Sequence, residues 1–260
     1  MSDPLNPYAS PQAPADFHSG GPERWAFERP YRSGRGRALF AMTMLGLFVV
    51  LYALGLATYL WELLLLGNLP PNAFIDSDSE PWVSLGHSQF AVGIAVVVAF
   101  PVTVVAFCMW IYRAHSNLGA LRATEIIYSA GWAVGSFFVP ILNLFRPFQI
   151  MVEIWRGSDP AELPAGSPRP ATLVGWWWGL WIVSGVLGRI GDRFARNAHE
   201  IPELMTASGL AILDAAVALA LAVCAILVIR TIDRNQSLRH ELLWKTPPTT
   251  AGNWNEQPPS

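Results

Sequence analysis

The sequence predicts an all-α, polytopic membrane protein: a bundle of four transmembrane helices with one further re-entrant or interfacial helical segment. Three observations predict this fold. Hydrophobic residues make up 52% of the 260 residues and charged residues only 14%, with a mean hydropathy of +0.33, whereas a soluble domain carries about 25% charged residues. Four apolar runs each have the length of a membrane-spanning helix. The basic residues collect in the segments on one side of those runs.

The two ends of the chain differ in composition from the part between them. Residues 1–37 contain six prolines among Ser, Gly, Asn and Gln, a mixture that buries too little apolar surface to fold, so we expect a disordered cytoplasmic arm. This arm has no apolar segment typical of a signal peptide, and we expect no cleaved leader. Residues 241–260 predict a second disordered tail, which leaves 38–240 as the membrane domain.

Four apolar runs of 20 to 23 residues predict the transmembrane helices. An α-helix rises 1.5 Å per residue, so about 20 residues cross a hydrocarbon core of about 30 Å. The runs are Ala38–Leu60, Phe90–Tyr112, Ala171–Ile190 and Ser208–Ile229. Tryptophans near predicted membrane–water boundaries are expected to anchor the helices there; these are Trp61, Trp110, Trp132, Trp155 and Trp176.

A fifth apolar run, Ala130–Phe145, has only 16 residues and is interrupted by Gly131, Gly135, Pro140 and Asn143. As a helix it would reach about 24 Å, short of a full crossing. If it does not cross, fourteen of the seventeen Lys and Arg residues lie on one side of the membrane; if it crosses, the division is ten against seven. The positive-inside rule favours the first arrangement. We therefore expect both termini in the cytoplasm and a fifth run that dips into the membrane or lies at its inner surface.

Small residues predict how the helices pack. In the fourth run Ala or Ser recurs at steps of three and four, which places these residues on one face. In the third run Gly175 and Gly179 have the same four-residue step. We expect both faces to bring helices of the same chain together, although a dimer interface uses the same pattern.

Polar residues near the fifth run form the candidate site. Pro147 is suited to the first turn of a short amphipathic helix and Gly157 to its end. One interpretation places this helix on the cytoplasmic surface with arginine toward lipid headgroups; the other turns polar residues toward a cavity in the bundle, as in transporters with broken helices. The candidate residues are Asn143, Arg146, Gln149, Glu153 and, from the fourth run, Asp214.

Asp214 is the one acidic residue inside a predicted crossing. A carboxylate within the membrane suggests a function such as a proton relay, and its expected partner is Arg189 or Arg193 at the outer end of the preceding run. Alternatively, Asp214 lies among the headgroups and is solvated.

Residues 113–159 carry a distinctive set of residues. The set comprises Arg113, Asn117, Leu118, Gly131, Trp132, Ala133, Val134, Pro140, Asn143, Arg146, Pro147, Glu153 and Trp155. With these residues the segment resembles the bacterial membrane-protein family known as domain of unknown function 4328, which is common in actinobacteria. The resemblance implies a polytopic bacterial membrane protein and supplies no catalytic residue.

The remaining patterns argue against several function classes. The sequence has no HExxH, CxxC, GxSxG, Walker or GxGxxG pattern, and its five histidines are scattered. Cys108 and Cys224 lie in apolar runs, where cysteine is typically a small hydrophobic residue. The net charge of −2 argues against nucleic acid as a partner. We therefore expect no enzymatic activity, no cofactor and no metal.

The function that the sequence favours is a non-enzymatic membrane scaffold or partner-binding module. Its partners are the lipid bilayer and proteins that bind the cytoplasmic tails, since such segments order on binding. Sixteen arginines against one lysine suggest a GC-rich bacterial genome, so the expected location is a bacterial inner membrane. The alternative is a small-solute transporter or channel-like carrier with a polar site at the re-entrant segment. The oligomeric state stays open.

Overall fold

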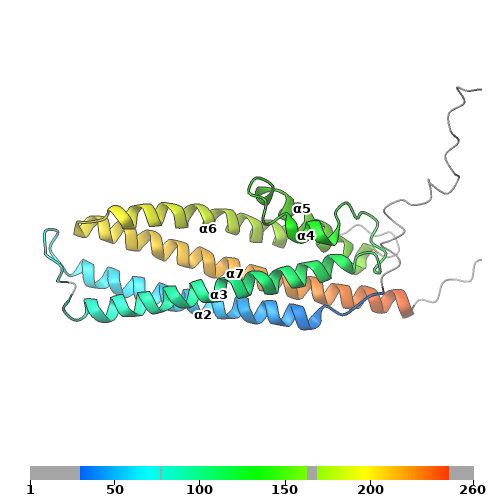
Figure 1. Ribbon diagram of the computed structural model, residues 1–260, viewed down its shortest axis with the longest axis horizontal. Helices are drawn as coiled ribbons and strands as arrows, with labels where there is room; N and C mark the ends of the chain where they lie inside the picture. Colours follow the sequence, from blue (N-terminus) through cyan, green and yellow to red (C-terminus); the bar gives the residue numbers. More distant parts are fainter. Residues whose placement is uncertain (1–29, 77, 163–168, 246–260) are drawn as a thin grey trace, which may run out of the picture.

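The computed structural model describes residues 30–76, 78–162 and 169–245 (Figure 1). Throughout these residues the regular elements are helices, so the predicted all-α class is confirmed. The elements are α2 (Arg35–Gly67), α3 (Trp82–Ser116), α4 (Ala130–Gly135), the 3₁₀ turn η2 (Leu142–Leu144), α5 (Arg146–Gly157), the 3₁₀ turn η3 (Pro160–Glu162), α6 (Thr172–Asn197) and α7 (Ile201–Lys245).

Four of these helices, α2, α3, α6 and α7, are long and apolar enough to cross a membrane, and they contain the four predicted runs. Each helix is longer than its run, because an apolar run marks only the part that hydrocarbon surrounds. The 45 residues of α7 span about 68 Å at 1.5 Å per residue, roughly twice the hydrocarbon thickness.

The boundaries of the predicted arms move as a result. The helix α2 begins at Arg35, inside the segment predicted as a disordered arm, and α7 continues to Lys245, inside the predicted tail. The extension of α7 stays helical because polar side chains on its last turns are buried against other elements, as detailed below. Residues 1–29 and 246–260, the rest of both predicted arms, lie outside the described residues.

The four long helices form an elongated bundle (Figure 1). The helix α2 packs against α3 and α7, and α6 packs against α7, whereas α3 and α6 do not pack closely along their backbones in the described part of the chain. We call the end that holds residues 30–34 and Lys245 the arm end, and the end with the α2–α3 and α6–α7 connections the loop end. We call the half of the bundle next to the arm end the arm half, and the half next to the loop end the loop half.

The fifth apolar run does not form a spanning helix. It contains the six residues of α4, a series of turns and η2, and α5 follows directly. Ser129 caps α4 by accepting a hydrogen bond from the Trp132 amide (3.3 Å), and Pro147 occupies the first turn of α5, the position where its missing N–H costs nothing. We call residues 117–162 the head; α4 packs on α3 and α5 on α6, so the head covers one side of the arm half (Figure 1).

The main hydrophobic core lies in the arm half, between the long helices and the head. Trp110 and Trp155 are buried in it, so the prediction that they anchor the protein at the interface is wrong: their rings fill space between elements. Trp61, Trp132 and Trp176 are exposed, as interfacial anchors require.

The small residues of α7 pack as predicted. Ser208, Ala215, Ala218, Ala222 and Ala225 are all buried on the face toward α2 and α6. The prediction for the third run is wrong, because a methyl group built on Gly175 or Gly179 would have no atom of another residue within 4 Å. These two glycines therefore bring no helix of this chain close.

Enlarging a residue on the buried face of α7 is expected to destabilise the bundle. Ala218→Leu forces extra methylenes into a packed contact and should lower the free energy of unfolding by about 1–3 kcal/mol. The measurement is thermal unfolding of the full chain in detergent micelles. The matched control is Val223→Leu, an exposed position on the same helix that should leave the melting temperature unchanged; equal shifts in both variants would contradict the assigned packing face.

Candidate functional site

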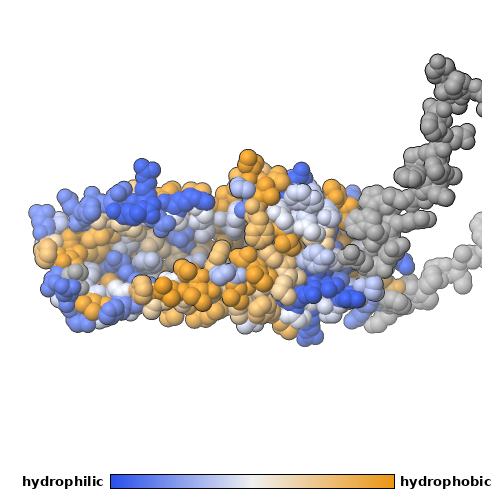
Figure 2. Space-filling model, in the orientation of Figure 1, coloured by the Kyte–Doolittle hydropathy of each residue, from blue (hydrophilic) through white to orange (hydrophobic). Residues whose placement is uncertain are grey.

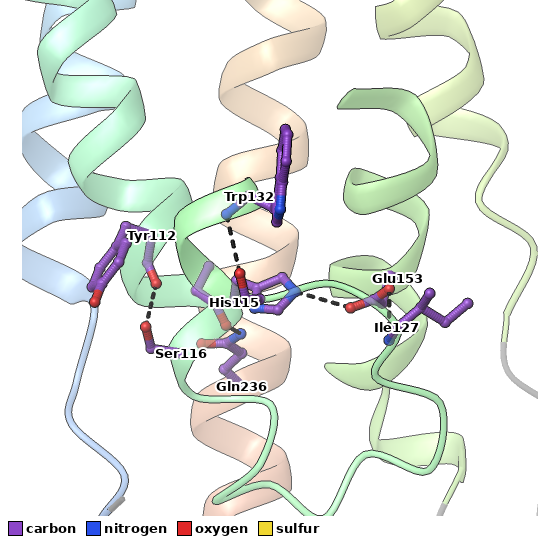
Figure 3. A network of polar contacts seen from close by, with 9 residues as sticks. Tyr112, His115, Ser116, Ile127, Trp132, Glu153 and Gln236 are labelled. Atoms are coloured by element: carbon purple, nitrogen blue, oxygen red, sulfur yellow. Dashed lines mark hydrogen bonds and ion pairs between the residues drawn. The ribbon is translucent and has the colours of Figure 1, made fainter. Parts of the chain in front are cut away.

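A buried hydrogen-bonded pair joins the head to α3. The His115 Nε2 and Glu153 Oε1 atoms lie 2.9 Å apart, and the side chains are only 3% and 6% exposed (Figure 3). The other carboxylate oxygen of Glu153 accepts a hydrogen bond from the Ile127 amide (3.2 Å). Glu153 therefore ties α5 to α3 and to the loop before α4, and both of its oxygens have partners inside the protein.

A second set of hydrogen bonds connects α3, α7 and the chain that precedes α2. The Asn117 amide nitrogen donates to Gln236 Oε1 (3.1 Å) and to the Arg32 carbonyl (3.0 Å), while Asn117 Oδ1 accepts from the Arg32 amide (3.3 Å). Gln236 in turn donates to the Ala114 carbonyl (2.8 Å) and to Ser158 Oγ (3.0 Å). Asn117 and Gln236 are thus buried with their amide groups paired, which fixes the start of α2 beside the end of α3.

A fully buried arginine on α7 holds the head loops. Arg239 is 0% exposed and donates to the carbonyls of Leu121 (2.8 Å), Arg122 (3.0 Å) and Asp159 (2.8 Å). Arg122 has a φ of 52°, a left-handed conformation that a non-glycine residue rarely adopts. Because Arg239 is fully buried and donates to both turns, its guanidinium fixes this strained turn and the turn after α5 in a single position.

The residues before α2 also contact the end of α7. The rings of Tyr31 and His240 stack with centroids 4.1 Å apart. Burial raises the pKa of the Tyr31 hydroxyl above its ordinary value, so the ring stays neutral in this contact. A methyl group at Gly34 would lie 3.5 Å from Arg113 Cγ and 3.6 Å from Asp233 Oδ1, so the backbone passes closely between α3 and α7.

Two exposed residues and a half-buried tyrosine of the head form a separate polar cluster. The Arg146 guanidinium donates to the Tyr128 hydroxyl and to Gln149 Oε1 (3.3 Å), and it lies 5.3 Å from the centre of the Tyr128 ring. Tyr128 donates to the same Gln149 oxygen (2.8 Å). Arg146 and Gln149 are exposed, so they face away from the bundle interior, whereas Tyr128 is half-buried.

The turns between α4 and α5 hold two buried polar atoms without a hydrogen-bond partner within the described chain. These are Ser136 Oγ and Asn143 Oδ1. Pro140 lies between them on the surface, among exposed apolar residues that include Ile141 and Phe145. This part of the head therefore presents an apolar surface.

Asp214 lies apart from the head, in the loop half of the bundle. Its Oδ1 accepts a hydrogen bond from Ser184 Oγ on α6 (3.2 Å). Arg189 donates instead to the Gly185 carbonyl of its own helix, and no ion pair joins Asp214 to Arg189 or Arg193 among the described residues. The predicted pairing is therefore wrong.

The five candidate residues do not form one site. Glu153 belongs to a buried structural pair, Arg146 and Gln149 to a surface cluster, Asn143 to the turns of the head and Asp214 to the other half of the bundle. Of the residues that carry the family resemblance, Arg113 and Asn117 contact the chain that precedes α2. Pro147 and Trp155 are buried residues of α5 itself. Trp132 is exposed on α4, and Pro140 is in a turn.

Sequence reasoning missed the residues that organise the arm end. His115, Gln236 and Arg239 carry most of the long-range side-chain hydrogen bonds there. One signal was available for the two on α7: the small-residue steps continue through Ile229 and Ile232 to positions 236 and 239, so these polar residues lie on the buried face. No local signal identifies His115.

The chain was compared with known proteins. The family model described as Domain of unknown function (DUF4328) matches residues 83–234, from the start of α3 to the last third of α7. No curated protein and no solved structure matches the chain.

Removing the buried guanidinium is expected to loosen the head. Arg239→Met keeps much of the side-chain volume but leaves three buried carbonyls without a donor, so unfolding should become about 2–5 kcal/mol easier. Thermal unfolding of the full chain measures the loss, and limited proteolysis should show faster cleavage within residues 118–128. Arg234→Met, at an exposed position on the same helix, is the control and should change stability by less than about 0.5 kcal/mol.

Proposed function

The chain belongs to the family of the domain of unknown function 4328, and from this we propose that it is a non-enzymatic membrane scaffold that binds a cytoplasmic protein partner through its two terminal arms. The observation that carries the proposal is the gathering of both arms at one place. The Tyr31–His240 stack and the Arg32–Asn117 hydrogen bonds hold the start of α2 against the end of α7.

The arrangement of the arm end supports a platform for binding. Both proline-rich segments, residues 1–29 and 246–260, continue from a surface whose parts are fixed by buried side chains. A partner that contacts both segments therefore meets two attachment points at a constant separation, which lowers the ordering cost of binding. This scaffold role requires no catalytic residues in the membrane-spanning helices.

The cytoplasmic placement of the arm end is part of the proposal. Eleven arginines of the described residues lie toward the arm end, whereas three lie on α6 toward the loop end. The arginines at the arm end are Arg32, Arg35, Arg37, Arg113, Arg122, Arg146, Arg156, Arg169, Arg230, Arg234 and Arg239. This distribution supports a cytoplasmic arm end and an inner bacterial membrane.

The transport alternative at the re-entrant segment lacks comparable support. It requires Asn143, Arg146 and Glu153 to line one cavity, yet Arg146 is on the surface and Glu153 is paired with His115. We therefore place the scaffold role first.

Thiol labelling tests the orientation. In a Cys108→Ala/Cys224→Ala background, Asn72→Cys at the loop end should react with a membrane-impermeant maleimide in right-side-out vesicles. Ser10→Cys in the first arm should react only after the vesicles are opened, because the arm faces the enclosed side. The reverse pattern would overturn the cytoplasmic placement and with it the proposed partner.

Site-specific photocrosslinking tests the partner. A photoreactive residue at Gln12 and, separately, at Thr249 is expected to crosslink to the same cytoplasmic protein, because the arms start from one surface. Asn117→Ala releases the first arm from α7 and should reduce the yield at both positions severalfold, while a probe at Asn72 should give no such adduct. Different adducts from the two arms, or yields unaffected by Asn117→Ala, would contradict the scaffold role.

A further inference from the structure

The loop half of the bundle contains a hollow that the proposed scaffold role does not use. Its volume is about 500 Å³, and all four long helices line it. The polar lining includes Glu62 and two tyrosines, Tyr52 and Tyr59, from α2, Gln89 from α3, Asp192 from α6 and Asp214 from α7. The volume lies within the range of small-molecule sites.

Small residues create this space. Gly55 of α2, Gly93 of α3, Gly188 of α6 and Ala211 of α7 all border the hollow. A methyl group built on Gly93 would have no other residue within 4 Å, so glycine there does not serve close helix packing. Because the residues that face one another here have small side chains or none, a volume between the helices stays open. This volume does not depend on the charges of the residues that line it.

The arm half shows what happens when the same gap is filled. There the ring of Phe107 on α3 lies 6.0 Å from that of Trp177 on α6 and 5.9 Å from that of Phe137 in the head. The loop half has no such aromatic bridge between α3 and α6 among the described residues. In Figure 2 the surface between α3 and α6 is recessed on this half and carries hydrophilic residues between hydrophobic ones. A molecule can therefore enter sideways between these helices.

The hollow is negatively charged. Three carboxylates from three different helices line it, and no lysine, arginine or histidine does so among the described residues. Glu62 accepts a hydrogen bond from Gln89 Nε2 (2.9 Å) and Asp214 accepts one from Ser184 (3.2 Å), so their partners are neutral. Carboxylates in a partly enclosed space attract a counter-ion more strongly than carboxylates on an open surface, because the lower local dielectric weakens screening.

The shape of the site decides which cation fits. The described residues contain no group of three metal-ligating side chains close enough to share a metal ion, so the carboxylates are too dispersed for a bare divalent cation. Glycine, alanine, leucine and valine make up most of the remaining lining, which favours an apolar body. Tyrosine rings near the acids offer additional attraction for a cation.

We propose that this hollow binds an organic cation with an apolar body, with Asp214 and Glu62 facing its charge and α3 and α6 admitting it from the side. The ligand binds in the loop half, away from the head and the arms. Disproof of this site would therefore leave the scaffold role untouched, and disproof of the scaffold role would leave this site untouched.

Equilibrium binding of tritiated tetraphenylphosphonium tests the proposal. The full chain is placed in nanodiscs of zwitterionic phosphatidylcholine, and empty nanodiscs give the partitioning of the probe into lipid. We expect saturable binding, weakened about tenfold or more by Asp214→Asn and by Glu62→Gln, since each removes one full charge at nearly constant shape. Glu203→Gln is the matched control, because Glu203 is a carboxylate of the same helix α7 that does not line this hollow.

A second variant separates loss of the site from loss of the fold. Gly93→Phe places a phenyl ring in the hollow, at a position where a methyl group would have no other residue within 4 Å. It should therefore abolish binding while the melting temperature stays within a few degrees. Unchanged binding in Asp214→Asn and Gly93→Phe would overturn the proposal. So would equal competition by neutral triphenylphosphine oxide, which indicates a merely apolar pocket, or displacement by millimolar Mg²⁺, which indicates a metal site.

Discussion

The buried face of α7 is the constraint on which the rest of the structure depends. Its residues recur at alternating steps of three and four from Ser208 to Arg239, so one continuous face of a helix of 45 residues is turned inward. Lipid gives no hydrophobic driving force between membrane helices, and association depends on close packing and hydrogen bonds. The alanines of this face let α2 and α6 approach, and both helices make their main contacts with α7. The helix α3 is then held mainly through α2.

The side chains on this face change along α7, and the two halves of the bundle differ accordingly. Toward the arm end Ala225 gives way to Ile229 and Ile232, then to Gln236 and Arg239, so the space between helices fills first with aliphatic groups and then with hydrogen bonds. Each buried hydrogen bond contributes about 1 kcal/mol net, and more where a charged donor takes part, so the arm half is the more stable half. From Ser208 to Ala225 the face carries only serine and alanine, and no bulky side chain in this stretch replaces the contacts that α3 and α6 lack.

This gradient explains which features the sequence could predict. Apolar run length identifies a membrane helix almost independently of its neighbours, because lipid imposes the same requirement on each, and the four long helices follow from it. The short helix α5 follows instead from Pro147 at its start and Gly157 at its end. Charge distribution likewise separated the fifth run from the spanning helices. Contacts such as His115–Glu153 join residues far apart in the chain, and no local pattern states which polar side chain meets which. Asp214 was recognised as unusual for its helix, but its neighbours Glu62 and Asp192 lie near helix ends, where acids are ordinary. Only the packing of three helices shows that these acids share a space.

The separation of the two halves also resolves how a membrane bundle keeps an unfilled, acidic space. Each carboxylate without a positively charged partner and each missing packing contact lowers stability. A bundle packed evenly along its length would become more stable if its helices closed the hollow. Here the arm half is fixed by the aromatic core, the His115–Glu153 pair and Arg239, which set the spacing of the helices before they reach the loop half. Helices are stiff over this distance, so the loop half inherits that spacing whether or not its side chains fill it. Glycine at position 93 and alanine along α7 then leave the volume open. Stability is thus concentrated at one end of the molecule, and the other end is free to carry charges and space that folding alone does not favour.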